Sequence, residues 1–136
     1  MDKIRVNSGI IIEVNDNGDT ISVNAEDQTF IDRFFELNEK LKAVVNDAKS
    51  ADMSDKTERG QLKYTIDKTK EIMIGIDNLF GRDACKKVFG DIIPSAYLIA
   101  DFFEQLTPIA KKYKDARQKQ IAEKYSNHSK FSNSVR

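Results

Sequence analysis

Residues 10–24 read IIIEVNDNGDTISVN and predict a β-hairpin. Alternating apolar and polar side chains flank an Asn17-Gly18 pair, and both residues of such a pair readily adopt the positive φ that a tight two-residue turn requires. This loop implies a register in which Val14 faces Ile21 and Ile12 faces Val23. All four apolar side chains then share one face, so turn chemistry and burial agree. A lone hairpin is marginally stable in water, and its apolar face must therefore pack on helices or on another copy.

Three long helices and one short helix are predicted after the hairpin, because apolar side chains recur there at steps of three and four residues. Gly81 and Gly90 are natural helix ends. Pro108 predicts a kink, since helical spacing continues beyond it. The predicted helices cover residues 26–48, 55–80, 82–89 and 94–125, with Asn24 or Asp27 capping the first and Ser54 the second.

The fold class that follows is α+β and predominantly α-helical, with an N-terminal β-hairpin at residues 9–24 or a small antiparallel sheet. The chain has 136 residues, a length that suits one domain. We expect a single domain over residues 1–125. Residues 126–136 are polar and aperiodic, and they predict a flexible basic C-terminal tail.

Charge is unevenly distributed along the chain. Of 22 basic and 22 acidic residues, eight basic and two acidic ones lie in residues 111–136, so this segment carries +6 and residues 1–110 carry −6. Such asymmetry is typical of nucleic-acid contact, or of a helix end that attracts an acidic partner or the acidic body of a neighbouring copy.

The sequence indicates no catalytic, cofactor-binding or metal-binding residues, and we expect no enzyme. A single cysteine, Cys85, is interpreted as a small buried apolar residue. Asp101 and Glu104 are three residues apart and are interpreted as a solvated helix face. The Asp16–Asp19 segment begins like a calcium loop, but the later ligands are missing.

Aromatic side chains and the basic C-terminal segment provide the candidate contact residues. Adjacent residues on a helix point about 100° apart, so Phe34 with Phe35, and Phe102 with Phe103, cannot both point into one core. One member of each pair is a candidate for contact with another subunit or a client helix. The partner-binding residues predicted in this way are Phe35, Tyr97, Phe103, Tyr113, Lys111, Lys112 and Arg117.

Two stretches support a family resemblance: IDNLFGRDACKKVFGD at residues 76–91 and SAYLIADFFEQLTPIAKKYKDARQKQIAEKY at residues 95–125. Together with the hairpin and the first helix, they resemble the small tail assembly chaperones of long-tailed phages and prophages of Gram-positive bacteria. The resemblance implies a non-enzymatic protein that binds and solubilises the tape measure protein and helps to recruit tail tube subunits. It also implies a homo-oligomer in the cytoplasm, the host cytoplasm if the protein is phage-encoded.

Two other functions remain open. The basic C-terminal helix and tail could bind nucleic acid through phosphate contacts, although the acidic body argues against it. A structural tail or connector subunit is the other alternative. No membrane contact is expected, because no apolar run approaches the ~18 residues that a membrane span needs.

Overall fold

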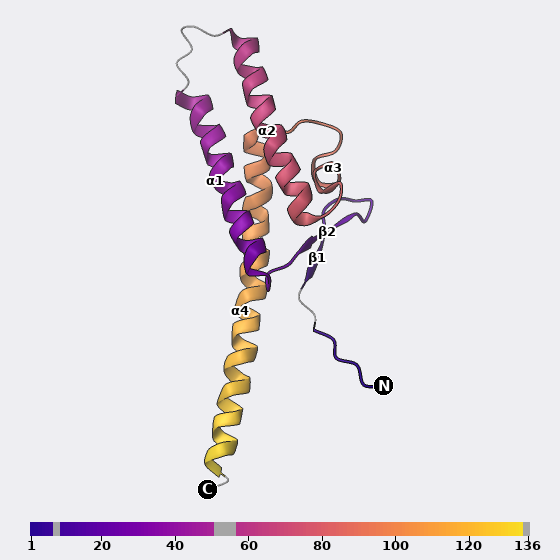
Figure 1. The fold of residues 1–136 in the computed structure, drawn as a ribbon, viewed down its shortest axis with the longest axis vertical. Coiled ribbons are helices and arrows are strands. Elements are labelled where there is room, and N and C mark those ends of the chain that lie inside the picture. Colours follow the sequence, from indigo (N-terminus) through magenta and orange to yellow (C-terminus); the bar gives the residue numbers. More distant parts are fainter. Residues whose placement is uncertain (7–8, 51–56, 135–136) are drawn as a thin grey trace. The chain divides into compact units, whose positions relative to one another are not determined.

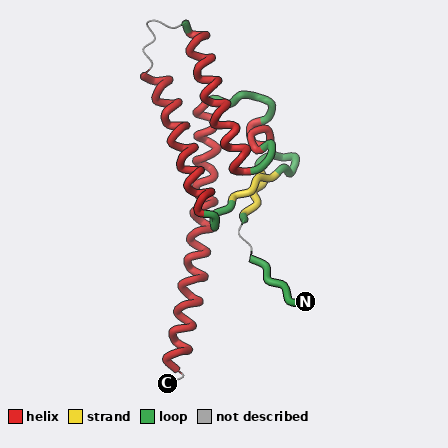
Figure 2. Tube along the Cα trace, in the orientation of Figure 1, coloured by secondary structure: helices red, strands yellow, loops and turns green. Residues whose placement is uncertain are grey.

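The computed structural model describes residues 1–6, 9–50 and 57–134, with side chains described for residues 1–6, 9–47 and 57–126. Within these described residues, two strands come first and four helices follow (Figures 1 and 2). The elements are β1 (Ile10–Glu13), β2 (Thr20–Val23), α1 (Gln28–Ser50), α2 (Glu58–Phe80), α3 (Ala84–Phe89) and α4 (Ala96–Ser134). This confirms the predicted α+β, predominantly helical fold with a small antiparallel sheet.

The contacts within the chain divide it into two compact units, residues 1–104 and residues 105–136. We call the first unit the body and the second the arm. The arm consists of the part of α4 that follows Glu104. Helix α4 continues to Ser134, whereas the sequence predicted that the helix ends at residue 125. No glycine or proline follows Pro108, so nothing in the chain stops the helix there.

The predicted hairpin is present, but its predicted register is wrong by two residues. Strands β1 and β2 pair antiparallel, with Ile12 opposite Ile21 and Ile10 opposite Val23. A shift of two residues preserves the side-chain alternation, so the predicted apolar face survives. Ile21 and Val23 are buried on that face.

The side chain of Asn15 explains why the hairpin loop is longer than the predicted two-residue turn. Its side-chain oxygen accepts hydrogen bonds from the backbone N–H groups of Asn17 and Asp19, and its amide nitrogen donates to the Asp19 carboxylate. The same nitrogen donates to the backbone carbonyl of Lys87 in α3, at 3.0 Å. The backbone N–H of Val14 donates to the Asp19 carbonyl at 3.0 Å, so the turn inside this pair spans the four residues 15–18. Gly18 supplies the positive φ of 83° at its end.

Helices α1 and α2 pack antiparallel along their apolar stripes (Figure 1). At one end the rings of Phe30 and Phe80 meet edge to face, with centroids 5.5 Å apart. Further along, Gly75 of α2 lies against the side chain of Leu37, where a β-carbon would collide. Glycine at position 75 thus allows α1 and α2 to pack closely.

The first turns of α4 complete the body between two sets of aromatic rings. Phe102 contacts Phe80 of α2 and Phe89 of α3, with centroids 5.6 and 5.8 Å apart. Phe103 contacts Phe34 of α1, with centroids 5.0 Å apart. Because α4 is covered from two directions here, both adjacent phenylalanines are buried.

Side chains cap the three long helices at their N-termini. Asp27 accepts from the backbone N–H of Thr29 at the start of α1, as predicted. Thr57 accepts from Gly60 N–H at the start of α2, and Ser95 accepts from Leu98 N–H at the start of α4. The predicted cap Ser54 lies outside the described residues. Gly81 and Gly90 end α2 and α3 with positive φ, which confirms both predicted stops.

Candidate protein-binding surface

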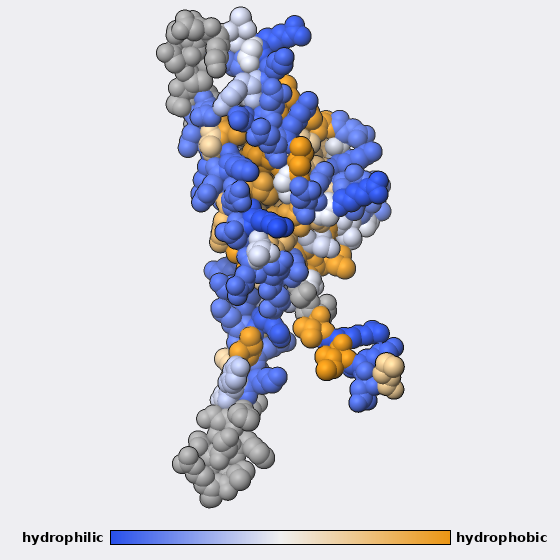
Figure 3. Space-filling model, in the orientation of Figure 1, coloured by the Kyte–Doolittle hydropathy of each residue, from blue (hydrophilic) through white to orange (hydrophobic). Residues whose placement is uncertain are grey.

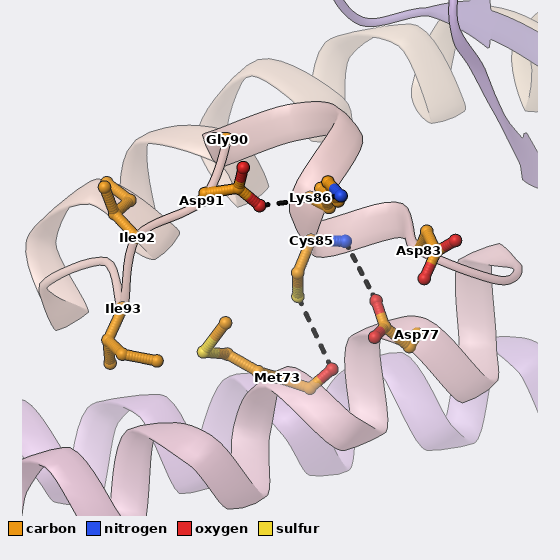
Figure 4. A pocket seen from close by; sticks show the side chains of 9 residues that line it. All are labelled: Met73, Asp77, Asp83, Cys85, Lys86, Gly90, Asp91, Ile92 and Ile93. Carbon is orange, nitrogen blue, oxygen red and sulfur yellow. Dashed lines mark hydrogen bonds and ion pairs between the residues drawn. The ribbon is translucent and has the colours of Figure 1, made fainter.

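A shallow hollow of about 350 Å³ lies between the C-terminal half of α2, helix α3 and the loop that follows it (Figure 4). Met73, Ile92 and Ile93 provide its apolar lining, and Cys85 faces it from α3. Charged groups stand at its rim, where Lys86 and Asp91 form an ion pair at 3.7 Å. An apolar floor with a charged rim suits an apolar side chain of a protein partner.

Cys85 is held in this hollow as a structural residue. Its backbone N–H donates to the Asp77 carboxylate at 2.8 Å, and its thiol donates to the Met73 carbonyl at 3.4 Å. Burial, followed by the nearby Asp77 charge, raises the pKa of the Cys85 thiol from 9.0 to about 12. The thiol is therefore protonated at ordinary pH. Because only the thiolate form of cysteine acts as a nucleophile, Cys85 is unreactive there. This agrees with the interpretation of Cys85 as a buried apolar residue.

Four large apolar side chains are exposed within seven residues, and two of them also line the hollow. They belong to the loop before α4 and to the first turn of that helix, and we call them the apolar strip: Ile92 (51% exposed), Ile93 (46%), Tyr97 (58%) and Leu98 (40%). Tyr97 is one of the predicted partner-binding residues. Large apolar side chains exposed together in one short segment are typical of a protein-binding surface.

A second exposed apolar pair lies on α1. Phe35, another predicted partner-binding residue, is 59% exposed, and Ile31 lies one turn before it at 39%. Asp32 and Glu39 are exposed beside the pair, at three residues before and four residues after Phe35. Figure 3 shows hydrophobic patches of this kind between hydrophilic side chains on the face in view. We call Ile31, Asp32, Phe35 and Glu39 the α1 face.

The prediction that Phe103 contacts a partner is wrong. Phe103 is 4% exposed, and its ring packs on Phe34. The prediction assumed that only one side of α4 faces the core. In the structure α1 covers a second side of α4, and Phe103 is buried there. On α1 the same reasoning holds, because Phe34 is half-buried and Phe35 is exposed.

The remaining predicted contact residues lie in the arm. Lys111, Lys112 and Arg117 are exposed, and Tyr113 is half-buried. Arg117 donates to the side-chain oxygen of Gln120 at 3.4 Å. Two further apolar residues one turn apart, Ile121 and Tyr125, are 42% and 70% exposed. The arm is therefore a basic helix that carries apolar side chains on its surface.

The described part of the chain contains neither a metal-binding cluster nor a membrane-spanning helix. Among the side chains described, those of residues 1–6, 9–47 and 57–126, no group of three or more His, Cys, Asp or Glu residues is placed to hold a metal ion. Over residues 1–6, 9–50 and 57–134, no helix combines the length and apolar character needed to cross a membrane. Asp101 and Glu104 are both exposed on α4, as a solvated face would be.

The model of a family of unknown function, DUF6673, matches residues 17–134. The chain belongs to this family. The match takes in both units, from the hairpin loop to the end of α4. No curated protein matches the chain, and no solved structure matches it. Membership in the DUF6673 family assigns no activity to the chain.

Sequence reasoning missed Ile31, Ile121 and the hollow. A signal for the first two exists, because Ile31–Phe35 and Ile121–Tyr125 each place two apolar side chains one helical turn apart. No local signal identifies the hollow. Met73 and Ile93 come from different segments, and only packing brings them together.

Proposed function

We propose that this DUF6673 protein is a tail assembly chaperone that binds an amphipathic helix of a client protein through the apolar strip and the adjacent hollow. The client, by the resemblance of the sequence, is the tape measure protein of a long-tailed phage or prophage. Binding keeps the client's apolar surface from aggregating until tail tube subunits assemble around it. The protein acts by covering a surface and not by catalysing a reaction.

The observation that carries this proposal is the exposure of four large apolar side chains within residues 92–98. An amphipathic helix presents apolar residues at steps of three and four, and it docks by placing them on such a patch. Met73 in the neighbouring hollow favours an adaptable fit, because its unbranched thioether side chain adjusts to differently shaped partners. Such adaptability suits a chaperone that must cover many similar helices along one client.

Co-expression with a tape measure protein encoded beside this gene tests the proposal. We expect the client to remain soluble and to elute with the chaperone in size-exclusion chromatography. Tyr97→Ser should reduce the recovered complex several-fold, because it removes a large apolar contact without disturbing a buried residue. Leu62→Ser is the matched control, since Leu62 is 59% exposed and belongs to α2 and not to the strip.

Two results would refute the chaperone function. One is a client that stays insoluble whether or not the chaperone is present. The other is a complex that forms equally well with Tyr97→Ser and with wild type. Detection of the protein in purified phage particles would instead favour a structural tail or connector subunit.

The basic arm favours one competing function, nucleic-acid binding. Lys111, Lys112, Lys114 and Lys119 are exposed there and would contact phosphates. This alternative predicts binding to a random-sequence duplex that weakens steeply as salt rises, and weakens equally for every sequence. Nucleic-acid binding that stays unchanged when the basic residues of the arm are replaced would exclude this alternative.

A further inference from the structure

The α1 face and the arm carry matching patterns of opposite charge. On α1, the apolar pair Ile31 and Phe35 has acidic residues one position after the first member and four positions after the second, at Asp32 and Glu39. On the arm, the apolar pair Ile121 and Tyr125 has basic residues four positions before the first member and one before the second, at Arg117 and Lys124. All eight side chains are exposed.

These positions fit the rules of a parallel two-helix coiled coil. In heptad terms both apolar pairs occupy successive d and a positions, the acidic residues occupy e positions, and the basic residues occupy g positions. In a parallel pair, a g residue approaches the e residue of the partner that lies five positions further along. The resulting pairs are Ile31 with Ile121, Phe35 with Tyr125, Asp32 with Arg117, and Glu39 with Lys124. An antiparallel arrangement would place e opposite e and g opposite g, and the charges would not meet.

We propose that the arm of a second copy of this chain docks on the α1 face in this parallel register. The occupant is a second copy because the chain's own α4 is already committed. Its Phe103 packs on Phe34 of α1, only three residues from Ile31. Ile121 lies 18 residues after Phe103 in the same helix.

Charge complementarity also favours the body of a second copy over its arm. The body carries −6, whereas residues 105–134 carry seven basic and two acidic side chains. Two arms side by side would therefore repel each other, and an arm beside a body is attracted. The interaction needs no client and is distinct from the apolar strip, so it stands or falls independently of the chaperone function.

Sedimentation velocity of the full-length protein over a range of concentrations tests the docking. We expect reversible self-association at low salt that weakens as salt rises, because the flanking charges are exposed. Ile121→Ser should weaken it about tenfold or more, since it removes a large apolar side chain that docking would bury. A wild-type protein that remains monomeric at every concentration would overturn the proposal.

Two lysine substitutions separate specific pairing from a general effect of charge. Lys124→Glu places two carboxylates opposite each other in the proposed pair with Glu39, and it should weaken association markedly. Lys119→Glu makes the same chemical change on the same helix, but its position points away from the Ile121–Tyr125 side. Equal weakening by the two variants would contradict the register.

A charge exchange gives the decisive comparison. The arm variant, Arg117→Glu with Lys124→Glu, and the body variant, Asp32→Lys with Glu39→Lys, should each be monomeric alone. Mixed together, they should associate, because the reversed arm then meets the reversed α1 face and the unaltered arm meets the unaltered α1 face. If the arm variant instead associates equally with wild type and with the body variant, which both carry the unaltered arm, the contact is between arms and the proposal fails.

Discussion

The carboxylate of Asp77 accepts a 2.8 Å hydrogen bond from the backbone N–H of Cys85, and this bond joins the last turns of α2 to the first turn of α3. Asp83 stands at the N-cap position of α3 with φ of 60° and makes no side-chain cap bond. A residue from the preceding helix thus replaces the local cap. This junction places Cys85 and the loop that carries Ile92 and Ile93, and so it supports the hollow.

Loss of this cap should destabilise the body. We expect Asp77→Ala to lower the free energy of unfolding by about 1–2 kcal/mol, because the buried N–H of Cys85 loses its acceptor. Asp77→Asn keeps an oxygen acceptor and should cost less. Urea denaturation followed by circular dichroism measures both. Asp67→Ala, an exposed aspartate on the same helix, should change stability by less than about 0.5 kcal/mol, and an equal loss there would contradict the prediction.

Gly75 and Leu37 should show strong energetic coupling. Gly75→Ala improves helix propensity by about 1 kcal/mol, but its β-carbon would collide with the buried Leu37 side chain, at a cost of about 1–3 kcal/mol. We therefore expect net destabilisation in the wild-type background. In the Leu37→Ala background the same change should be stabilising, because the obstructing atoms are gone. A double-mutant cycle from chemical denaturation gives the coupling, and simple additivity would refute the contact.

The Cys85 thiol should resist modification in the folded protein. Its pKa of about 12 and its burial keep the reactive thiolate scarce, so a thiol reagent at pH 8 should react far more slowly with native protein than with urea-unfolded protein. Following the release of a coloured thiol from the reagent measures both rates. Equal rates would show that the thiol is open to solvent.

The raised pKa of the Cys85 thiol also predicts how the stability of the folded protein depends on pH. Between pH 9 and about 12 the unfolded state loses the Cys85 proton and the folded state retains it, so the free energy of unfolding falls as pH rises. Below pH 9 both states keep the proton and the effect vanishes. Cys85→Ala should therefore lose stability less steeply than wild type over this window. Parallel curves for the two proteins would exclude the linkage.

Asn15 should matter more than its place in a surface loop suggests. It makes hydrogen bonds within the loop and one to the Lys87 carbonyl of α3, so Asn15→Ala should cost about 1–3 kcal/mol of stability. Asp16→Ala alters the neighbouring exposed residue of the same loop and should have a small effect. Thermal unfolding of the two variants makes the comparison, and similar melting temperatures would argue against Asn15 as the organiser of the loop.

The sequence by itself determined the features that depend on local periodicity and capping. The 3.6-residue repeat identified the helices, glycines marked the ends of α2 and α3, and strand alternation identified the buried face of the hairpin. It also separated Phe34 from Phe35, because only their own helix and its immediate packing set that difference. These signals lie within a few residues of the feature that they specify, and one chain segment contains all the necessary information.

Tertiary structure decided what depends on segments that are distant in sequence. The hairpin register follows in part from Asn15 reaching Lys87, and the burial of Phe103 follows from α1 covering a second side of α4. Likewise the hollow exists only where α2 and the loop after α3 meet. In each case a side chain contacts a residue that is distant in sequence. No local sequence pattern predicts such a contact, because burial and hydrogen bonding depend on which segments the fold places within a few ångströms.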